Sequence, residues 1–324
     1  MLELASHFLA LAEKQTSAAL LMMGHRLMGL SLMTTGDIVG SLPHYNRAIA
    51  LYDPVEHRPL AARFAGVDAR VSLFIHRSWA LWWLGYPEAA LADVDHALRD
   101  ARDIGQAATV MYALGLTTPS DLFCGNYESA TAKSDELIAL ADKKSALFWK
   151  ARGMMNWGCV LALTGKSADA VQMITSGISA RRSTGATLNV PFFLLYLASA
   201  YADLRQIDDA WRCIAEATTA IETTKEKWPE AELHRIAGEI ALKSPEPDAP
   251  KAERHFERAL GVAREQQAKS WELRASMSLA RLWRDQGKVQ QARELLAPVY
   301  GWFTEGFDTR DLKEAKALLE ELAV

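Results

Sequence analysis

The sequence predicts an all-α superhelix in which helix pairs stack along the chain as a solenoid. Three observations support this fold class. A pattern recurs about every 40 residues, small and apolar residues recur at helical spacing within each unit, and Gly or Pro marks the connections between helices. A repeat that cannot bury its own apolar face must stack on its neighbours, so this regularity predicts a core shared by successive units.

The repeat is defined by a small residue, the marker, which in most units follows a turn glycine by five positions. The markers are Ser41, Ala90, Ala130, Ala170, Ala210, Ala252 and Ala292. They are separated by 49, 40, 40, 40, 42 and 40 residues, a register that chance would not hold over seven units. The pattern therefore predicts about seven helix pairs.

Each unit also carries the contacts that a helix pair needs. The predicted second helix has further residues four and seven positions after its marker, as in Val94 and Ala97, and these lie on one helix face. A small residue twelve positions before the marker, such as Gly29 or Gly158, lets the first helix approach the second closely. These positions resemble the tetratricopeptide pattern, with the unit of about 34 residues extended to about 40.

Proline segments and chain ends depart from the repeat. Residues 53–59 and 243–250 are rich in proline and are predicted to be loops between helices. Residues 1–15 are predicted to hold the second helix of an incomplete earlier unit, whereas residues 309–322 are predicted to form an amphipathic capping helix. We therefore expect a single solenoid over residues 1–324 that is the C-terminal part of a longer polypeptide.

Composition and charge indicate a globular protein and disfavour several classes of function. Half of the residues are apolar, 23% are charged, and the formal net charge is −4. Basic residues are dispersed among acidic ones, so no nucleic-acid-binding stripe is predicted, and no segment has the roughly 20 apolar residues of a membrane span. The scattered Cys124, Cys159 and Cys213 favour buried thiols and a reducing cytoplasm over a disulfide framework.

Several segments resemble one bacterial family. They are Tyr52-Asp53-Pro54 with His57-Arg58, Trp79–Pro87, Glu230–Arg235, Leu279–Gly287 and Leu296–Thr309. They are similar to the C-terminal tetratricopeptide region of multidomain proteins that carry a class III adenylate/guanylate cyclase domain followed by an AAA-type ATPase domain. The resemblance implies a regulatory region that senses a ligand or partner. Catalytic positions of that family lie in the upstream domains, so no catalytic residue is carried over.

Motifs that could carry chemistry are better explained as parts of helices and turns. Gly165–Ser167 resembles the end of a phosphate-binding loop, but Val160 replaces the required first glycine and no strand precedes it. Asp93–His96 lies within one predicted helix, where its side chains do not converge on a metal ion. His57 with Asp53 leaves a loop-borne site open. We predict no catalytic residue, no metal site, no cofactor, and no enzyme activity for this segment.

The concave surface of such a solenoid, lined by the first helices, is the predicted binding surface. The register places these residues on it: Trp79, Trp82, Trp83, Tyr112, Phe123, Arg152, Phe192, Arg235, Arg274, Arg281 and Arg284. The N-terminal half of this groove is aromatic and the C-terminal half is rich in arginine, and both are frequent binding hot spots. The alternative is that the tryptophans are mostly core.

Two functions remain open. The first is a regulatory binding module of a cyclase/ATPase signalling protein in the bacterial cytoplasm, and the second is a stand-alone scaffold that assembles partner proteins. A catalytic groove is disfavoured because no site chemistry converges. The expected partners are a protein or peptide, a small-molecule effector, the upstream domains of the parent chain, or a second copy of this chain. Nucleic acid and membranes are not expected.

Overall fold

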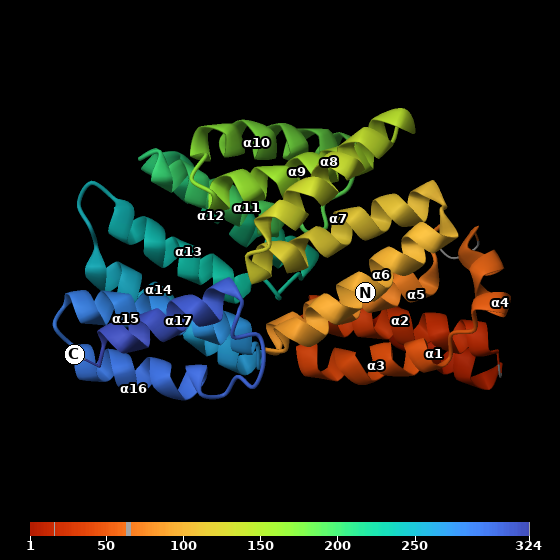
Figure 1. The fold of residues 1–324 in the computed structure, drawn as a ribbon, viewed down its shortest axis with the longest axis horizontal. Helices are drawn as coiled ribbons and strands as arrows, with labels where there is room; N and C mark the ends of the chain where they lie inside the picture. The colour runs from red at the N-terminus through yellow and green to blue at the C-terminus, as the bar shows by residue number, and fades with distance from the viewer. Residues whose placement is uncertain (16, 63–65, 324) are drawn as a thin grey trace.

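The computed structural model describes residues 1–15, 17–62 and 66–323, and its regular secondary structure in these ranges is helical (Figure 1). The first helices of the seven pairs are α2 (Ala18–Thr34), α5 (Ala69–Trp83), α7 (Ala107–Cys124), α9 (Leu147–Leu163), α11 (Val190–Asp203), α13 (Glu230–Lys243) and α15 (Lys269–Asp285). The second helices are α3 (Ile38–Ala50), α6 (Pro87–Ile104), α8 (Tyr127–Lys143), α10 (Ser167–Ser183), α12 (Ile207–Thr224), α14 (Ala249–Glu265) and α16 (Val289–Tyr300). The remaining helices are α1 (Leu2–Lys14), α4 (Pro54–His57), the 3-10 helix η1 (Arg58–Ala62) and α17 (Arg310–Glu321). The predicted all-α class is confirmed.

Small residues set the distance between the two helices of a pair. All seven markers lie in second helices and are fully buried. A Cβ atom on Gly158 would lie 2.4 Å from Ile174 Cγ1, and one on Gly29 would lie 2.9 Å from the ring of Tyr45. Only a hydrogen atom fits at these two positions, so the residues that define the repeat are also those that allow the close approach.

In six of the seven pairs the turn between the two helices contains one residue in the left-handed conformation, and the α13–α14 turn is the exception. Gly125 and Gly165 supply it with φ angles of 83° and 79°, and Arg205 adopts the same region with φ 62° despite its Cβ atom. Gly165–Ser167 is such a turn, because α10 begins at Ser167. The interpretation of this segment as a helix stop and start, rather than a phosphate-binding loop, is confirmed.

Residues 53–59, which the sequence predicts to be a loop, contain the short helix α4 instead. Asp53 caps it, since its Oδ1 atom accepts the N–H of Val55 at 2.7 Å. Pro54 is compatible with the first helical position, where a backbone N–H has no partner to lose. The prediction was wrong because it treated proline only as a helix terminator. His57 Nδ1 accepts the N–H of Asp53 at 2.8 Å, which ties this buried histidine to the turn.

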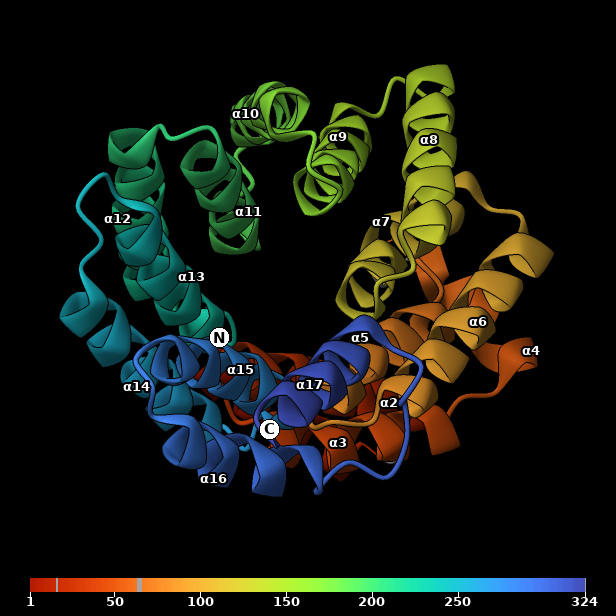
Figure 2. The same ribbon diagram turned by 60° about the vertical axis from the view of Figure 1, so that its left-hand side comes forward.

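The array curves until its C-terminal helices contact its N-terminal ones, which makes a ring (Figure 2). Ser270 Oγ of α15 donates a hydrogen bond to the carbonyl of Trp82 on α5. Glu305 accepts the N–H groups of Glu88 and its neighbour, at 2.9 and 3.0 Å, in the first turn of α6. A carboxylate is well placed there, because the first N–H groups of a helix lack internal partners. These contacts join segments that are far apart in the sequence.

The three cysteines are free and buried, as predicted. Burial raises the pKa of Cys124 to about 12 and that of Cys213 to about 11, so these two thiols are protonated at neutral pH. They contribute to packing as small apolar side chains.

Among the helices of the described residues, none is both long enough and apolar enough to span a bilayer.

Candidate functional site

Two cavities lie between the first helices, which are nearer the centre of the ring than their partners (Figure 2). The ion-pair cavity, of about 140 Å³, is lined mainly by α11, α13, α15 and α17. The arginine–aromatic cavity, of about 360 Å³, is lined by α2, α5, α7, α9 and the connections that follow α10 and α12. Its defining side chains are Arg26, His76, Trp79, Tyr112, Phe148, Trp149, Arg152, Arg181, Glu226 and Trp228.

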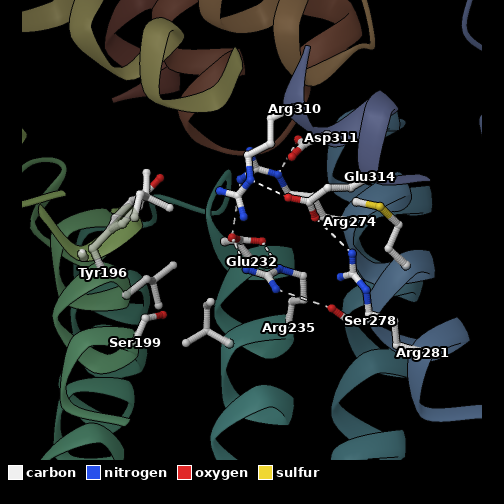
Figure 3. Close-up of a pocket in the computed structure, with 15 residues that line it drawn as sticks. Tyr196, Ser199, Glu232, Arg235, Arg274, Ser278, Arg281, Arg310, Asp311 and Glu314 are labelled. Carbon is white, nitrogen blue, oxygen red and sulfur yellow. Dashed lines mark hydrogen bonds and ion pairs between the residues drawn. The ribbon is translucent and has the colours of Figure 1, made fainter. Parts of the chain in front are cut away.

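Every arginine that lines the ion-pair cavity is paired with a carboxylate (Figure 3). The closest pairs are Arg235–Glu232 at 2.7 Å, Arg274–Asp311 at 2.6 Å, Arg281–Glu314 at 3.0 Å and Arg310–Glu314 at 2.6 Å. Burial opposes ionisation of Glu232, but the charges of Arg235 and Arg274 hold its pKa below the usual range. The cavity is therefore a nearly neutral ionic network that ties α13, α15 and α17 together.

Arg274 also connects this network to helices α5 and α7, which the C-terminal helices contact where the ring closes. Its Nη2 atom donates to the carbonyl of Phe123 at 3.2 Å, and its guanidinium lies 5.0 Å from the centre of the Trp82 ring. Trp82 in turn stacks on Phe123 at 4.2 Å and contacts Trp271 edge-on at 4.9 Å. Arg274 thus has three kinds of partner: carboxylates, a backbone carbonyl and aromatic rings.

Four of the predicted groove residues are covered by the ring closure. Trp82, Trp83, Phe123 and Phe192 are each 2% exposed or less. Trp83 stacks on Trp228 at 4.8 Å between ring centres, and the other three pack against one another or against α15. They form inner core rather than an open surface, because the C-terminal helices close over the aromatic half of the predicted groove.

Six of the other predicted residues line one of the two cavities. Trp79, Tyr112 and Arg152 line the arginine–aromatic cavity, whereas Arg235, Arg274 and Arg281 line the ion-pair cavity.

Arg284 lies outside both cavities, near the end of α15, where it pairs with Asp285 and Glu321. The structure does not bring the eleven residues together into one surface, and partner binding by them stays a prediction.

A proline in α7 positions Arg152 in the arginine–aromatic cavity. Pro119 has no N–H, so the carbonyl of Gly115, four residues earlier, loses its helical partner. That carbonyl accepts Arg152 Nε at 3.1 Å and Asn156 Nδ2 at 2.9 Å. A Cβ atom on Gly115 would lie 3.2 Å from the Arg152 side chain. The Gly-x-x-x-Pro spacing therefore creates an acceptor that holds Arg152 from the next unit.

Two buried arginines of this cavity have free donors. Arg152 and Arg181 are 1% and 4% exposed. Arg181 Nη2 donates to the carbonyl of Leu188 at 2.9 Å, but its Nε and Nη1 atoms, and Nη1 of Arg152, have no hydrogen-bond partner among the described residues. Burial and the nearby charge of Arg181 lower the pKa of Arg152 to about 9, and burial lowers that of Arg181 to about 10. Both guanidinium groups therefore remain charged at neutral pH.

The lining of this cavity carries an excess of positive charge. Its lining, over the part of the chain that the structure describes, contains three arginines, including Arg26 on α2, and the single carboxylate of Glu226. Glu226 Oε2 accepts the N–H of Asn189 at 2.9 Å, while Oε1 has no partner among the described residues, and burial raises the pKa of this carboxyl group. His76 is neutral at pH 7, because burial and the charge of Arg26 lower its pKa to about 3.

The lowered pKa of His76 predicts a pH-dependent stability. Between the unfolded pKa of about 6.5 and the folded value of about 3, the unfolded chain binds more protons, so the free energy of unfolding falls as the pH falls. We expect His76→Gln to reduce this slope by up to about 1.4 kcal/mol per pH unit below pH 6. Denaturant unfolding at several pH values between 6.5 and 5 measures it. An unchanged slope in the variant would contradict the assignment.

Sequence reasoning did not find most of this cavity. Arg152 is placed on the inner face by the register of α9, but Arg181 lies near the end of a second helix. Glu226 and Trp228 lie in the connection between α12 and α13. The sequence feature that relates to these residues is the repeat length of about 40. It indicates that each connection between units is several residues long, but not which of those residues enter a cavity.

The comparisons with known proteins concern the fold. No protein-family model matches this sequence, and no curated protein matches it. Among solved structures, a Rap protein complexed with competence and sporulation factor is similar with a TM-score of 0.63 and 11% identity, over 96% of this chain and 79% of that one. The apo form of RapI gives 0.56 and 12%, over 93% and 99%. Aspartyl phosphate phosphatase F from Bacillus subtilis gives 0.55 and 12%, over 89% and 73%. The chain is thus an all-α superhelix of tetratricopeptide-like helix pairs.

Proposed function

We propose that this chain is a non-catalytic binding module that takes a peptide or small effector in the arginine–aromatic cavity. The observation that carries the proposal is the composition of this cavity, where aromatic rings surround buried arginines with free donors. Tyr112, Trp149 and Arg26 are half-buried, so the cavity is reached from the surface. Binding sites of this kind combine an apolar lining with a few polar groups that orient the ligand.

The titratable groups of the cavity favour binding over catalysis. A general acid or base works best with a pKa near the operating pH. His76 has a pKa of about 3, and the neighbouring thiol of Cys159 is fully buried with a raised pKa. The two arginines are charged at neutral pH and serve as fixed hydrogen-bond donors.

The fold is consistent with ligand binding inside the ring. A Rap protein of similar fold has been solved in complex with competence and sporulation factor. The regulatory part of the proposal rests on the resemblance to the C-terminal region of cyclase–ATPase proteins. In such a parent, ligand occupancy of the ring would control the upstream domains. A continuous upstream reading frame for those domains supports regulation, and a stand-alone gene supports the scaffold alternative.

Substitution of Trp149 tests the proposed site. We expect peptides selected from a random library on the wild-type chain to bind Trp149→Ala about tenfold more weakly or worse, as for an aromatic hot spot. Isothermal titration calorimetry measures both affinities. Trp211→Ala is the matched control, since Trp211 is half-buried on α12, outside both cavities. Equal loss in both variants would remove the cavity as the binding site, and failure to select any peptide would remove peptides as its ligand.

A further inference from the structure

Among the described residues, Arg152 and Arg181 have no direct carboxylate partner, unlike the arginines of the ion-pair cavity. Each arginine of that cavity is within hydrogen-bond distance of a carboxylate. Arg152 and Arg181 instead donate to backbone carbonyls and lie over aromatic rings, Phe193 at 4.9 Å and Phe148 at 4.5 Å. Glu226 acts on both arginines through space, but one carboxylate does not balance the three arginines of this lining. Buried charge that is only partly compensated is costly, and a bound anion would offset this cost.

The two arginines with free donors line one cavity and come from consecutive helices. Arg152 comes from α9 and Arg181 from α10, and both line the arginine–aromatic cavity. Arg152 donates one hydrogen bond to the carbonyl of Gly115, and Arg181 donates one to the carbonyl of Leu188. The orientation of each guanidinium is therefore set before a ligand arrives. An anion that accepts from both would gain charge-assisted hydrogen bonds without reordering either side chain.

The remainder of the cavity suits a flat apolar group. Trp79, Tyr112, Trp149 and Trp228 contribute aromatic surface, and His76 is uncharged at neutral pH. A volume of about 360 Å³ is at the lower end of ligand pockets, which is enough for a ligand of about one aromatic amino acid.

Glu226 favours a singly charged anion over a doubly charged one. Its carboxylate lies in the same lining and would repel each negative charge that enters. A carboxylate has one negative charge and two coplanar acceptor oxygens, which match two guanidinium groups. A phosphate monoester carries nearly two charges at neutral pH and would be repelled more strongly.

We propose that Arg152 and Arg181 form an anion site in the arginine–aromatic cavity, and that it binds the carboxylate of an aromatic carboxylic acid. The acid is either a free small molecule or the C-terminal residue of a peptide, since both present the same chemistry. This inference rests on the proposed binding function and adds the ligand class.

A pair of probes that differ only in charge tests the anion site on the unmodified protein. N-acetyl-phenylalanine carries the carboxylate, and N-acetyl-phenylalanine amide lacks it. We expect the acid to bind at least tenfold more tightly, as measured by quenching of the tryptophan fluorescence of the cavity. Equal affinities, or tighter binding of phenyl phosphate than of the acid, would overturn the proposal. A tripeptide ending in phenylalanine separates the two sources, because the peptide source predicts that it binds more tightly than the single residue.

Variants of the two arginines supply the second measurement. Arg181→Met and Arg152→Met are expected to reduce the affinity for the acid at least tenfold and to leave the weaker affinity for the amide unchanged. Because the substitution removes an unpaired buried charge, we expect Tm without ligand to be unchanged or higher. Arg281→Gln, in the other cavity, is the control with unchanged affinity.

Failure of this inference can be distinguished from failure of the proposed function. If selected peptides depend on Trp149 but bind equally well as C-terminal amides, the cavity is a binding site and the anion site is wrong. If the acid binds and its affinity survives both arginine substitutions, the anion site is likewise wrong. If binding of neither the selected peptides nor the acid depends on Trp149, the proposed function itself fails.

Discussion

Replacement of Arg274 by methionine is expected to lower the free energy of unfolding by about 3–5 kcal/mol, the usual cost of breaking a buried ion pair from one side. The Arg274 side chain is 11% exposed; it bonds Asp311 at 2.6 Å and lies 3.6 Å from Glu232. Methionine keeps much of the side-chain volume, so the loss is electrostatic rather than a cavity effect. Asp311 would lose its partner, and Glu232 would keep only Arg235.

The measurement is urea denaturation followed by circular dichroism, with a matched exposed arginine as control. Arg284 on the same helix pairs with Asp285 and Glu321 near the surface, so Arg284→Met should cost less than about 1 kcal/mol. Adding Asp311→Asn to Arg274→Met should recover part of the loss, because it removes the uncompensated carboxylate. Equal costs for the two arginine variants would show that the network does not stabilise the ring.

Trp82→Ala is expected to cost about 3–5 kcal/mol and to weaken the ring closure. The indole is 2% exposed and packs between Phe123 of α7 and Trp271 of α15, while Arg274 lies over its face. Removing it leaves a cavity at the contact between the first and last parts of the array. The surrounding side chains can fill this cavity only in part, because the neighbouring rings belong to two separate helices, α7 and α15.

Two measurements distinguish a local loss of packing at Trp82 from opening of the ring. Chemical denaturation gives the stability change, and small-angle X-ray scattering gives the radius of gyration, which should increase if the C-terminal helices separate from α5. Trp211→Ala is the control, with a smaller cost and an unchanged radius, because Trp211 is half-buried on α12. A compact Trp82→Ala protein of near-wild-type stability would contradict the role assigned to this contact.

The residues of the arginine–aromatic cavity show how far sequence reasoning reaches into the site. Trp79, Tyr112 and Arg152 lie on the inner face where the helical register predicts them, because side chains on one helix face recur with a known period. Arg181 and Glu226 were missed, because they lie at a helix end and in a connection between units. The path of such connections depends on packing against neighbouring units. A short-range sequence pattern does not encode this packing.

The arginines that were predicted to bind a partner also show the difference between helical register, which the sequence reveals, and packing between units, which it does not. Arg235, Arg274 and Arg281 do face the inner side of the ring, but each is paired with a carboxylate. The pairing of Arg235 with Glu232 on its own helix was readable from their spacing of three residues. The pairing of Arg274 with Asp311 was not, because it depends on where the capping helix docks.

The repeat pattern alone is sufficient to predict the helix pairs. Burial of a marker such as Ala90 and the close approach of two helices at Gly158 are local consequences of helical spacing. Closure of the ring, and with it the division of the predicted groove into a buried aromatic core and two cavities, emerged only in three dimensions. The position of Trp82 against Trp271 is the sum of small rotations at every interface between them. Each rotation depends on how whole side-chain surfaces pack, and a spacing rule within one unit cannot specify that sum.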